Sequence, residues 1–131
     1  MRETSVAFEV SSALPYAEAV SQARKALAAE GFGVLTEIDV QATMKAKLGV
    51  DGQPYVILGA CHPPSAHRAL TVAAEVGVLL PCNVTVSVEE GTTVVRAMNP
   101  GSVMGLIGKP ELAEVGEHVG AALRRVLASC V

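Results

Sequence analysis

The amino-acid sequence predicts one α+β domain over residues 1–131, in which helices cover one side of a largely antiparallel sheet. Stretches that alternate apolar and polar residues are interleaved with stretches whose apolar residues recur every three or four positions. The turn signal Glu90-Gly91 joins two alternating stretches directly, which indicates an antiparallel hairpin. Half of the 131 residues are apolar and 18% are charged, a composition that supports one hydrophobic core and excludes general disorder.

A strand and a helix are predicted at the start of the chain. Residues 4–10 alternate as a strand with one buried face does. A helix is expected from Pro15, a residue suited to a first helical turn, to Gly31, which ends it. The stripe expected to face the core consists of Tyr16, Val20, Ala23 and Leu27.

The next segment predicts a second strand and a short helix. In residues 32–39 one strand face is expected to carry Phe32, Val34, Thr36 and Ile38. The other face then carries Gly33, Leu35, Glu37 and Asp39, so the two carboxylates share a face. Residues 40–48 predict a helix closed by Gly49, with Lys45 and Lys47 pointing away from its apolar stripe of Val40, Met44 and Leu48.

A continuous apolar run over residues 55–60 predicts a central strand covered on both faces. It leads into Cys61-His62-Pro63-Pro64, where the prolines can open a helix but cannot continue a strand. That helix is expected over residues 64–75, and its inward side is expected to carry Ala66, Leu70 and Ala73.

The second half of the chain predicts a hairpin and a long terminal helix. Residues 77–82 are compatible with more than one structure, whereas 83–88 and 93–98 alternate as the two strands of the hairpin. Residues 102–108 predict a loop with one helical turn. From Pro110 a C-terminal helix is indicated by the apolar spacing of Leu112, Val115, Val119, Leu123 and Val126.

Charge and composition exclude several classes of partner. The net charge is −3, with no basic face to neutralise phosphates and few aromatic rings to stack on bases, so nucleic acid is not an expected partner. The sequence contains no secretory signal and no apolar run long enough to cross a membrane. We therefore expect a soluble cytoplasmic protein whose three cysteines are reduced.

The candidate site residues lie mostly at the ends of predicted strands. Cys61 sits where a strand meets a helix start, a position that favours a nucleophile or metal ligand, although a small buried residue is the simpler interpretation. His62 is a candidate base for Cys61, but adjacent residues of a strand point to opposite faces. Cys61, His62, His67 and Cys82 are ligand types for a transition metal but lack paired zinc-site spacing.

Other polar residues carry weaker signals. Glu37 and Asp39 are candidate paired carboxylates, and the alternative is that they simply interact with Lys45 and Lys47. Cys130, near the end of the chain, is expected to be exposed and able to form adventitious intermolecular disulfides.

Consecutive motifs resemble the DUF302 family of bacterial and archaeal proteins. They are EGFGVLTEIDV at 30–40, LGACHPP at 58–64, Ala69-Leu70, and GVLLPCNV at 77–84. The resemblance implies an α+β fold similar to that of the TATA-binding protein, and often a dimer. It implies no activity, because the family has none established, and it places Glu37, Asp39, Cys61, Cys82 and Asn83 within family motifs. The family often has Asn where this chain has His62, which argues against His62 as a required base or ligand.

Three functions remain open from the sequence. The leading hypothesis is a homodimeric module that binds a small molecule or a metal in a pocket lined by Glu37, Asp39, Cys61, Cys82 and Asn83. The first alternative is a thiol enzyme or redox sensor that uses Cys61. The second is a purely structural or interaction protein. The sequence identifies no cofactor.

Overall fold

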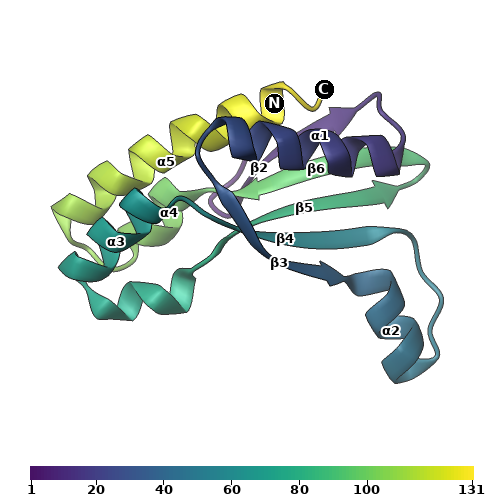
Figure 1. Ribbon diagram of the computed structural model, residues 1–131, viewed down its shortest axis with the longest axis horizontal. Helices are drawn as coiled ribbons and strands as arrows, with labels where there is room; N and C mark the ends of the chain where they lie inside the picture. Colours follow the sequence, from purple (N-terminus) through teal and green to yellow (C-terminus); the bar gives the residue numbers. More distant parts are fainter.

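The computed structural model describes residues 1–131 and contains one six-stranded antiparallel sheet in the order β1-β2-β6-β5-β4-β3 (Figure 1). The strands are β1 (Arg2–Glu3), β2 (Ala7–Ser12), β3 (Gly33–Asp39), β4 (Tyr55–Cys61), β5 (Cys82–Glu89) and β6 (Thr92–Met98). The helices are α1 (Tyr16–Ala29), α2 (Val40–Leu48), α3 (Pro63–Val72), the 3-10 helix η1 (Ala74–Leu79), α4 (Pro100–Gly105) and α5 (Pro110–Ala128). The predicted fold class is confirmed.

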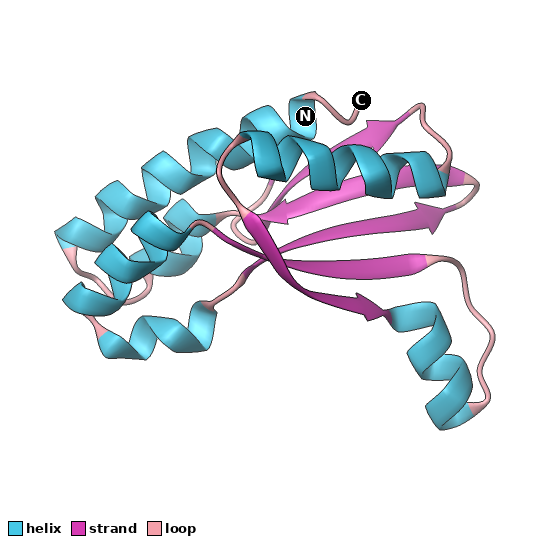
Figure 2. Ribbon diagram, viewed as in Figure 1, coloured by secondary structure: helices cyan, strands magenta, loops and turns pink.

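The core lies between one face of the sheet and the helices α1 and α5, which run across that face (Figure 2). Alternate residues of the strands point into it, so Phe8, Val84 and Val95 are fully buried. Leu27 of α1 and Leu123 of α5 pack against them and are also fully buried. The helices α3 and α4 pack against α5 at one end of the sheet, which places the end of β4 beside three helices.

The C-terminal helix and the hairpin follow their predictions closely. Helix α5 begins at the predicted Pro110, and its whole predicted apolar stripe is buried. Strands β5 and β6 are joined at Glu90-Gly91, where both residues have positive φ angles of 50° and 79°. Glycine adopts such an angle without a steric penalty, which explains why Gly91 stands at the turn between these two strands.

A bulge in β3 changes which side chains share a face. Val34 pairs with Ala60 and Thr36 pairs with Gly59, so Leu35 is an extra residue with no partner on β4. Glu37 and Asp39 do share a face, as predicted, but the bulge places them on the face of Val34 and not opposite it. The predicted grouping of Val34 with Thr36 is therefore wrong, because strict alternation contains no bulge.

The region from β4 to η1 departs from the prediction in two ways. Helices cover only one face of the sheet, so Ile57 of β4 is partly exposed and the strand is not covered on both faces. The helix ends at Val72, and its buried face is formed by Ser65 and Ala69, whereas Leu70 is 42% exposed. The residues that follow form η1, which the helical spacing of the sequence does not distinguish from a continuing helix.

Helix α2 projects from the rest of the molecule (Figure 1). The side chain of Asp39 accepts a hydrogen bond from the Ala42 amide at 2.8 Å, and Gly49 ends the helix with φ +66°, as predicted. No residue of α2 is buried. The predicted apolar stripe of Val40, Met44 and Leu48 is therefore not buried against the rest of the chain.

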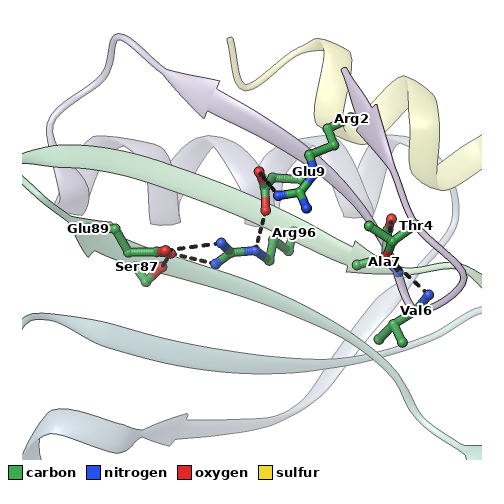
Figure 3. Close-up of polar contacts among 8 residues, drawn as sticks. All are labelled: Arg2, Thr4, Val6, Ala7, Glu9, Ser87, Glu89 and Arg96. Carbon is green, nitrogen blue, oxygen red and sulfur yellow. Dashed lines mark hydrogen bonds and ion pairs between the residues drawn. The ribbon is translucent and has the colours of Figure 1, made fainter.

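The uncovered face of the sheet carries a charged cluster (Figure 3). Arg96 of β6 donates to Glu9 of β2 at 2.6 Å and to Glu89 of β5 at 2.5 and 3.1 Å. Ser87 also donates to Glu89, at 2.8 Å. Since three adjacent strands each contribute a member, the cluster joins the centre of the sheet to β2.

Two expectations near the chain ends are corrected. The first long strand spans Ala7–Ser12, two or three residues later than expected, and Val6 is exposed. Cys130 is fully buried, so the expectation of an exposed thiol is wrong. The chain continues past the end of α5 with a turn that directs Cys130 inward, and its thiol donates to the Val126 carbonyl at 3.3 Å.

Candidate functional site

Two cysteines line one small pocket where β4 ends and β5 begins. The strands are neighbours, and Ala60 lies directly opposite Cys82, so the GAC and PCN motifs meet at one end of the sheet. This thiol pocket has a volume of about 20 Å³, enough for about one water-sized group. It is lined by Ala60, Cys61, His62, Ser65, Ala66, Leu80, Cys82, Met104 and Val119.

The chain reaches this arrangement through the sharp transition from β4 to α3. Pro63 occupies the first position of α3, where its fixed φ angle suits a helix and its missing N–H costs no hydrogen bond. His62 is therefore the last extended residue, and its Nδ1 is hydrogen-bonded to Ser65 Oγ at 2.7 Å. Leu80–Pro81, a cis peptide bond, leads into β5 on the opposite side of the pocket.

The two thiols of the pocket differ in exposure. Cys61 is half-buried, whereas Cys82 is 5% exposed. Burial, and to a smaller extent the nearby Cys61, raises the pKa of the Cys82 thiol to about 11. Cys82 is therefore a neutral thiol at physiological pH and behaves as a small apolar lining group.

A second hollow adjoins the thiol pocket on the α5 side. Its volume is about 210 Å³, and it is lined by Glu30, Phe32, His62, His118, Val119, Ala122 and Arg125. The His62 ring lies 5.4 Å from the Phe32 ring and 6.0 Å from the His118 ring, measured between centroids. We call it the imidazole hollow. His62 and Val119 line both this hollow and the thiol pocket.

The charged members of the imidazole hollow are paired with each other. Arg125 donates from Nη2 to the Glu30 carboxylate at 2.8 Å and from Nε at 3.0 Å. These hydrogen bonds lower the pKa of the Glu30 carboxyl and raise that of the Arg125 guanidinium. The two imidazoles are consequently the polar groups of the hollow that carry no such charged partner.

Glu37 and Asp39 lie in a different place from the cysteines. They pair with Leu58 and Val56, three and five residues before Cys61 along β4, or roughly 10 and 16 Å at about 3.3 Å per residue. They line a third depression, the acidic hollow, of about 350 Å³ together with Tyr16, Ala17, Val20 and Val56. One pocket shared by the carboxylates and the thiols does not form.

The carboxylates also do not bind the lysines named as their alternative partners. Glu37 pairs with Arg24 of α1 at 2.9 Å, whereas Lys45 pairs with Asp51 at 2.9 Å. Asp39 is occupied in part by capping α2. The physical reason is the direction of α2, because the helix runs away from the sheet (Figure 1) and Lys45 and Lys47 lie in its last turn.

Comparison with known proteins identifies the family. Residues 8–130 match the family model described as a domain of unknown function, DUF302. The chain belongs to the DUF302 family. It is also similar to the crystal structure of an uncharacterized conserved DUF302 protein from Bacillus stearothermophilus, with 32% identity and a TM-score of 0.90 over 95% of this chain and 98% of that chain. No curated protein matches the sequence.

Several sequence-based candidates of this DUF302 chain lie outside the two adjoining cavities. Asn83 is exposed and pairs with Gly59, on the sheet face opposite to Cys82. His67 is exposed on α3. No three His, Cys, Asp or Glu side chains lie together as a metal site would need, so Cys61, His62 and Cys82 do not form a complete ligand set. None of the helices combines the length and hydropathy that a membrane span requires.

Sequence reasoning missed His118 and Ser65 as members of this candidate site. His118 belongs to no motif and reaches His62 only because α5 packs against α3. Ser65 has the i+3 spacing of a helix cap from His62, and this spacing is the one signal that could have indicated the hydrogen bond between them.

Proposed function

We propose that this DUF302 protein is a small-molecule binding module whose site combines the thiol pocket with the imidazole hollow. The observation that carries this proposal is that His62 and Val119 line both cavities. A single ligand that passes beside His62 would occupy both. The thiol pocket accepts one small group, and the rest of the ligand would lie in the imidazole hollow.

The linings of the two cavities support a ligand with one polar and one short apolar end. Most of the thiol pocket is apolar, with Ala66, Leu80 and Met104 among its lining residues. In the imidazole hollow, each imidazole can donate or accept a hydrogen bond according to its tautomer. Short carboxylates have this chemistry, because their oxygens bind imidazole N–H groups and their methyl ends fit a pocket of this size.

A binding titration with acetate, propionate and butyrate tests the proposal. We expect amide and imidazole NMR signals of His62 and His118 to shift on titration, and we expect an affinity optimum at one chain length because the thiol pocket is small. His62→Ala should weaken binding at least tenfold. His67→Ala is the matched control, since it removes an exposed imidazole from α3, the helix that follows His62, and His67 lines neither cavity.

The outcomes separate this function from its alternatives. Equal binding by the His62→Ala and His67→Ala proteins would contradict the proposed site. Failure of all three carboxylates to shift any signal of the two cavities would contradict the ligand class. Copurification of a metal that Cys61→Ser removes would favour the metal-binding form of the sequence hypothesis.

A thiol-based sensor is the second candidate, and one observation favours it. Cys61 is the half-buried thiol of the pocket, so it is more accessible to reagents than the buried Cys82, and it immediately precedes the N-cap residue of α3. The neighbouring His62 is not placed as its base, because Nδ1 is bound to Ser65 and the ring packs near Phe32 and His118. This candidate therefore requires fast modification of Cys61 without help from His62.

The remaining expectations from the sequence are part of the same proposal. We infer a homodimer and a cytoplasmic location, and we expect no nucleic acid as partner because the chain has a net charge of −3. A purely structural role is the alternative in which neither cavity binds anything, and the carboxylate titration distinguishes it.

A further inference from the structure

Three sulfur-containing side chains belong to the lining of the thiol pocket. Cys61 comes from the end of β4, Cys82 from the start of β5 and Met104 from α4. The chain contains three cysteines and four methionines, and three of these seven residues line one cavity that holds about one water-sized group. Three separate elements of the fold therefore bring sulfur to the same small space.

The Cys82 thiol is buried without a hydrogen-bond partner. The residue is 5% exposed, and the hydrogen bonds of the structure that involve sulfur all belong to Cys130. Cys130 is the other buried cysteine, and its thiol donates to the Val126 carbonyl at 3.3 Å. Most buried polar side-chain atoms in proteins have a partner. The sulfur atom of Cys82 has none within the chain, so its lone pairs are free for a ligand in the pocket.

Met104 reaches the pocket because α4 packs closely on α5. A Cβ atom added to Gly116 of α5 would lie 2.8 Å from the carbonyl oxygen of Pro100, so this approach requires a glycine. It leaves Met104 only 2% exposed. A thioether has no proton to lose before it binds a metal, and the unbranched side chain can adjust its position by rotation about three bonds. Met104 is therefore a neutral and adaptable sulfur donor beside the two thiols.

The type of donor atom determines which metal ion such a pocket selects. Thiolates and thioethers select copper(I), whereas magnesium, calcium and manganese prefer oxygen ligands. Zinc in a closed protein site takes four ligands, and no three His, Cys, Asp or Glu side chains lie together in this structure. Copper(I) needs fewer ligands than zinc. Two thiolates and one thioether are sufficient for it.

The imidazole of His62 lines the same pocket, but its nitrogen atoms are directed elsewhere. Nδ1 is hydrogen-bonded to Ser65 Oγ at 2.7 Å. The edge that carries Nε2 faces Gly31, where an added Cβ atom would lie 3.4 Å from this nitrogen. Gly31 stands between Glu30 and Phe32, which both line the imidazole hollow. Nε2 is therefore directed toward the imidazole hollow, and the donor atoms that the thiol pocket offers to a metal are sulfur.

We propose that the thiol pocket binds one copper(I) ion through the sulfur atoms of Cys61, Cys82 and Met104. Each thiol releases its proton to solvent when the metal binds, and the thioether binds without a change of protonation. The volume of the pocket, about 20 Å³, accommodates a single ion and no cluster of several. This inference goes beyond the carboxylate site, because the ion takes the place of the apolar end of that ligand.

An anaerobic titration of the reduced protein with copper(I) tests the site. A chromophoric copper(I) chelator serves as the competitor, and the loss of absorbance of its copper complex gives the stoichiometry and the dissociation constant. We expect one copper(I) ion per chain. X-ray absorption spectroscopy of the copper-loaded protein should show sulfur neighbours only. Zinc(II), titrated against a zinc indicator, should not bind in the pocket.

Met104→Leu is the decisive variant, because leucine has a similar volume and lacks only the sulfur atom. It should weaken copper(I) binding by about tenfold or more, since the loss of an outer partner of a metal site already has an effect of this size. Met98→Leu is the matched control. Met98 is partly buried on β6 and does not line the thiol pocket, so its replacement should leave copper(I) binding unchanged.

The cysteines provide a second comparison. Cys61→Ser and Cys82→Ser should each weaken copper(I) binding at least as strongly as Met104→Leu does. Cys130→Ser is the control, because it removes a buried thiol that does not line the pocket. Circular dichroism confirms that each variant is folded. Cys61 is only half-buried, so its variant keeps the test decisive even where replacement of Cys82 prevents folding.

Three results would overturn the proposal. They are a wild-type protein that binds copper(I) no more tightly than Cys61→Ser does, a Met104→Leu protein that binds it as the wild type does, and nitrogen or oxygen neighbours around the bound copper. The copper(I) titration contains no carboxylate ligand, and the carboxylate titration contains no metal. This inference and the proposed function can therefore fail separately.

Discussion

Arg96 holds Glu89 across the β5–β6 hairpin through two hydrogen bonds, at 2.5 and 3.1 Å. These bonds, followed by the one from Ser87, lower the pKa of the Glu89 carboxyl from 4.5 to about 2. A carboxyl whose pKa is lower in the folded state stabilises the fold above its unfolded pKa, and this stabilisation is lost as the pH falls through the folded pKa.

Replacement of Glu89 therefore has a defined pH dependence. Glu89→Gln should lower the free energy of unfolding at neutral pH by less than about 1 kcal/mol, because the side chain is 46% exposed and the ion pair is screened by solvent. The difference from wild type should shrink between pH 4.5 and pH 2. Urea unfolding across this range measures it. Glu90→Gln, at the exposed turn, is the control, and an equal pH dependence in both variants would argue against the assignment.

The three cysteines should react with alkylating agents in a fixed order. Cys61 is half-buried, whereas Cys82 and Cys130 are buried, with pKa values raised by burial. In the folded protein at neutral pH, iodoacetamide should therefore modify Cys61 first, and the other two should react at the rate of unfolding. Peptide mass spectrometry over a time course measures the order. Modification of Cys82 before Cys61 would be inconsistent with this structure.

Replacement of Gly116 and of Gly120 in α5 by alanine should change the stability of the protein in opposite directions. A methyl group at Gly116 would lie 2.8 Å from the Pro100 carbonyl oxygen and 2.9 Å from the Gly101 Cα, both backbone atoms of α4. At Gly120 the nearest atom would be 3.6 Å away, an ordinary contact. Gly116→Ala should lower stability by about 1–3 kcal/mol through overpacking, whereas Gly120→Ala should raise it by up to about 1 kcal/mol through helix propensity. Chemical denaturation of both variants measures whether the free energy of unfolding falls or rises.

The hydrogen bond between Ser65 and His62 should fix the imidazole of the proposed site. Ser65→Ala removes the partner of Nδ1 and should lower stability by about 1 kcal/mol. It should also change the ¹⁵N shifts of the His62 ring, and it should weaken carboxylate binding less than His62→Ala does. Thr71→Ala on the same helix is the control, since its exposed hydroxyl bonds only to the His67 carbonyl. Unchanged His62 shifts in Ser65→Ala would refute the positioning role.

Elements defined by local chemistry could be predicted from the sequence. The Glu90-Gly91 turn and the apolar spacing after Pro110 each determine an element without help from the rest of the chain. The bulge at Leu35 could not be predicted, because one inserted residue reverses the faces while the local alternation of apolar residues continues. The inward face of α3 was also missed, because packing against α5 and η1 selects Ser65 and Ala69.

Only the part of the candidate site that depends on strand ends could be predicted from the sequence. Cys61 and Cys82 each end or begin a strand, and strand pairing alone brings them together. Glu37 and Asp39 also lie on a neighbouring strand, but the register places them further along β4. His118 enters the site through helix packing, which a strand pattern does not contain. Whether the fold resembles the TATA-binding protein stays a prediction.

The pairing of β2 with β6 bears on the order in which the chain folds. Glu9 and Arg96 are 87 residues apart in sequence yet hydrogen-bonded, whereas β5 and β6 are joined by a tight turn. Closing the long loop costs more chain entropy, so the hairpin should form before β2 docks on it. Truncation of Val86 in the hairpin should chiefly slow refolding, and truncation of Val10 in β2 should chiefly accelerate unfolding. Strand β2, although it comes early in the chain, would then join the sheet only after β5 and β6 have formed, and β1, which pairs only with β2, would follow it.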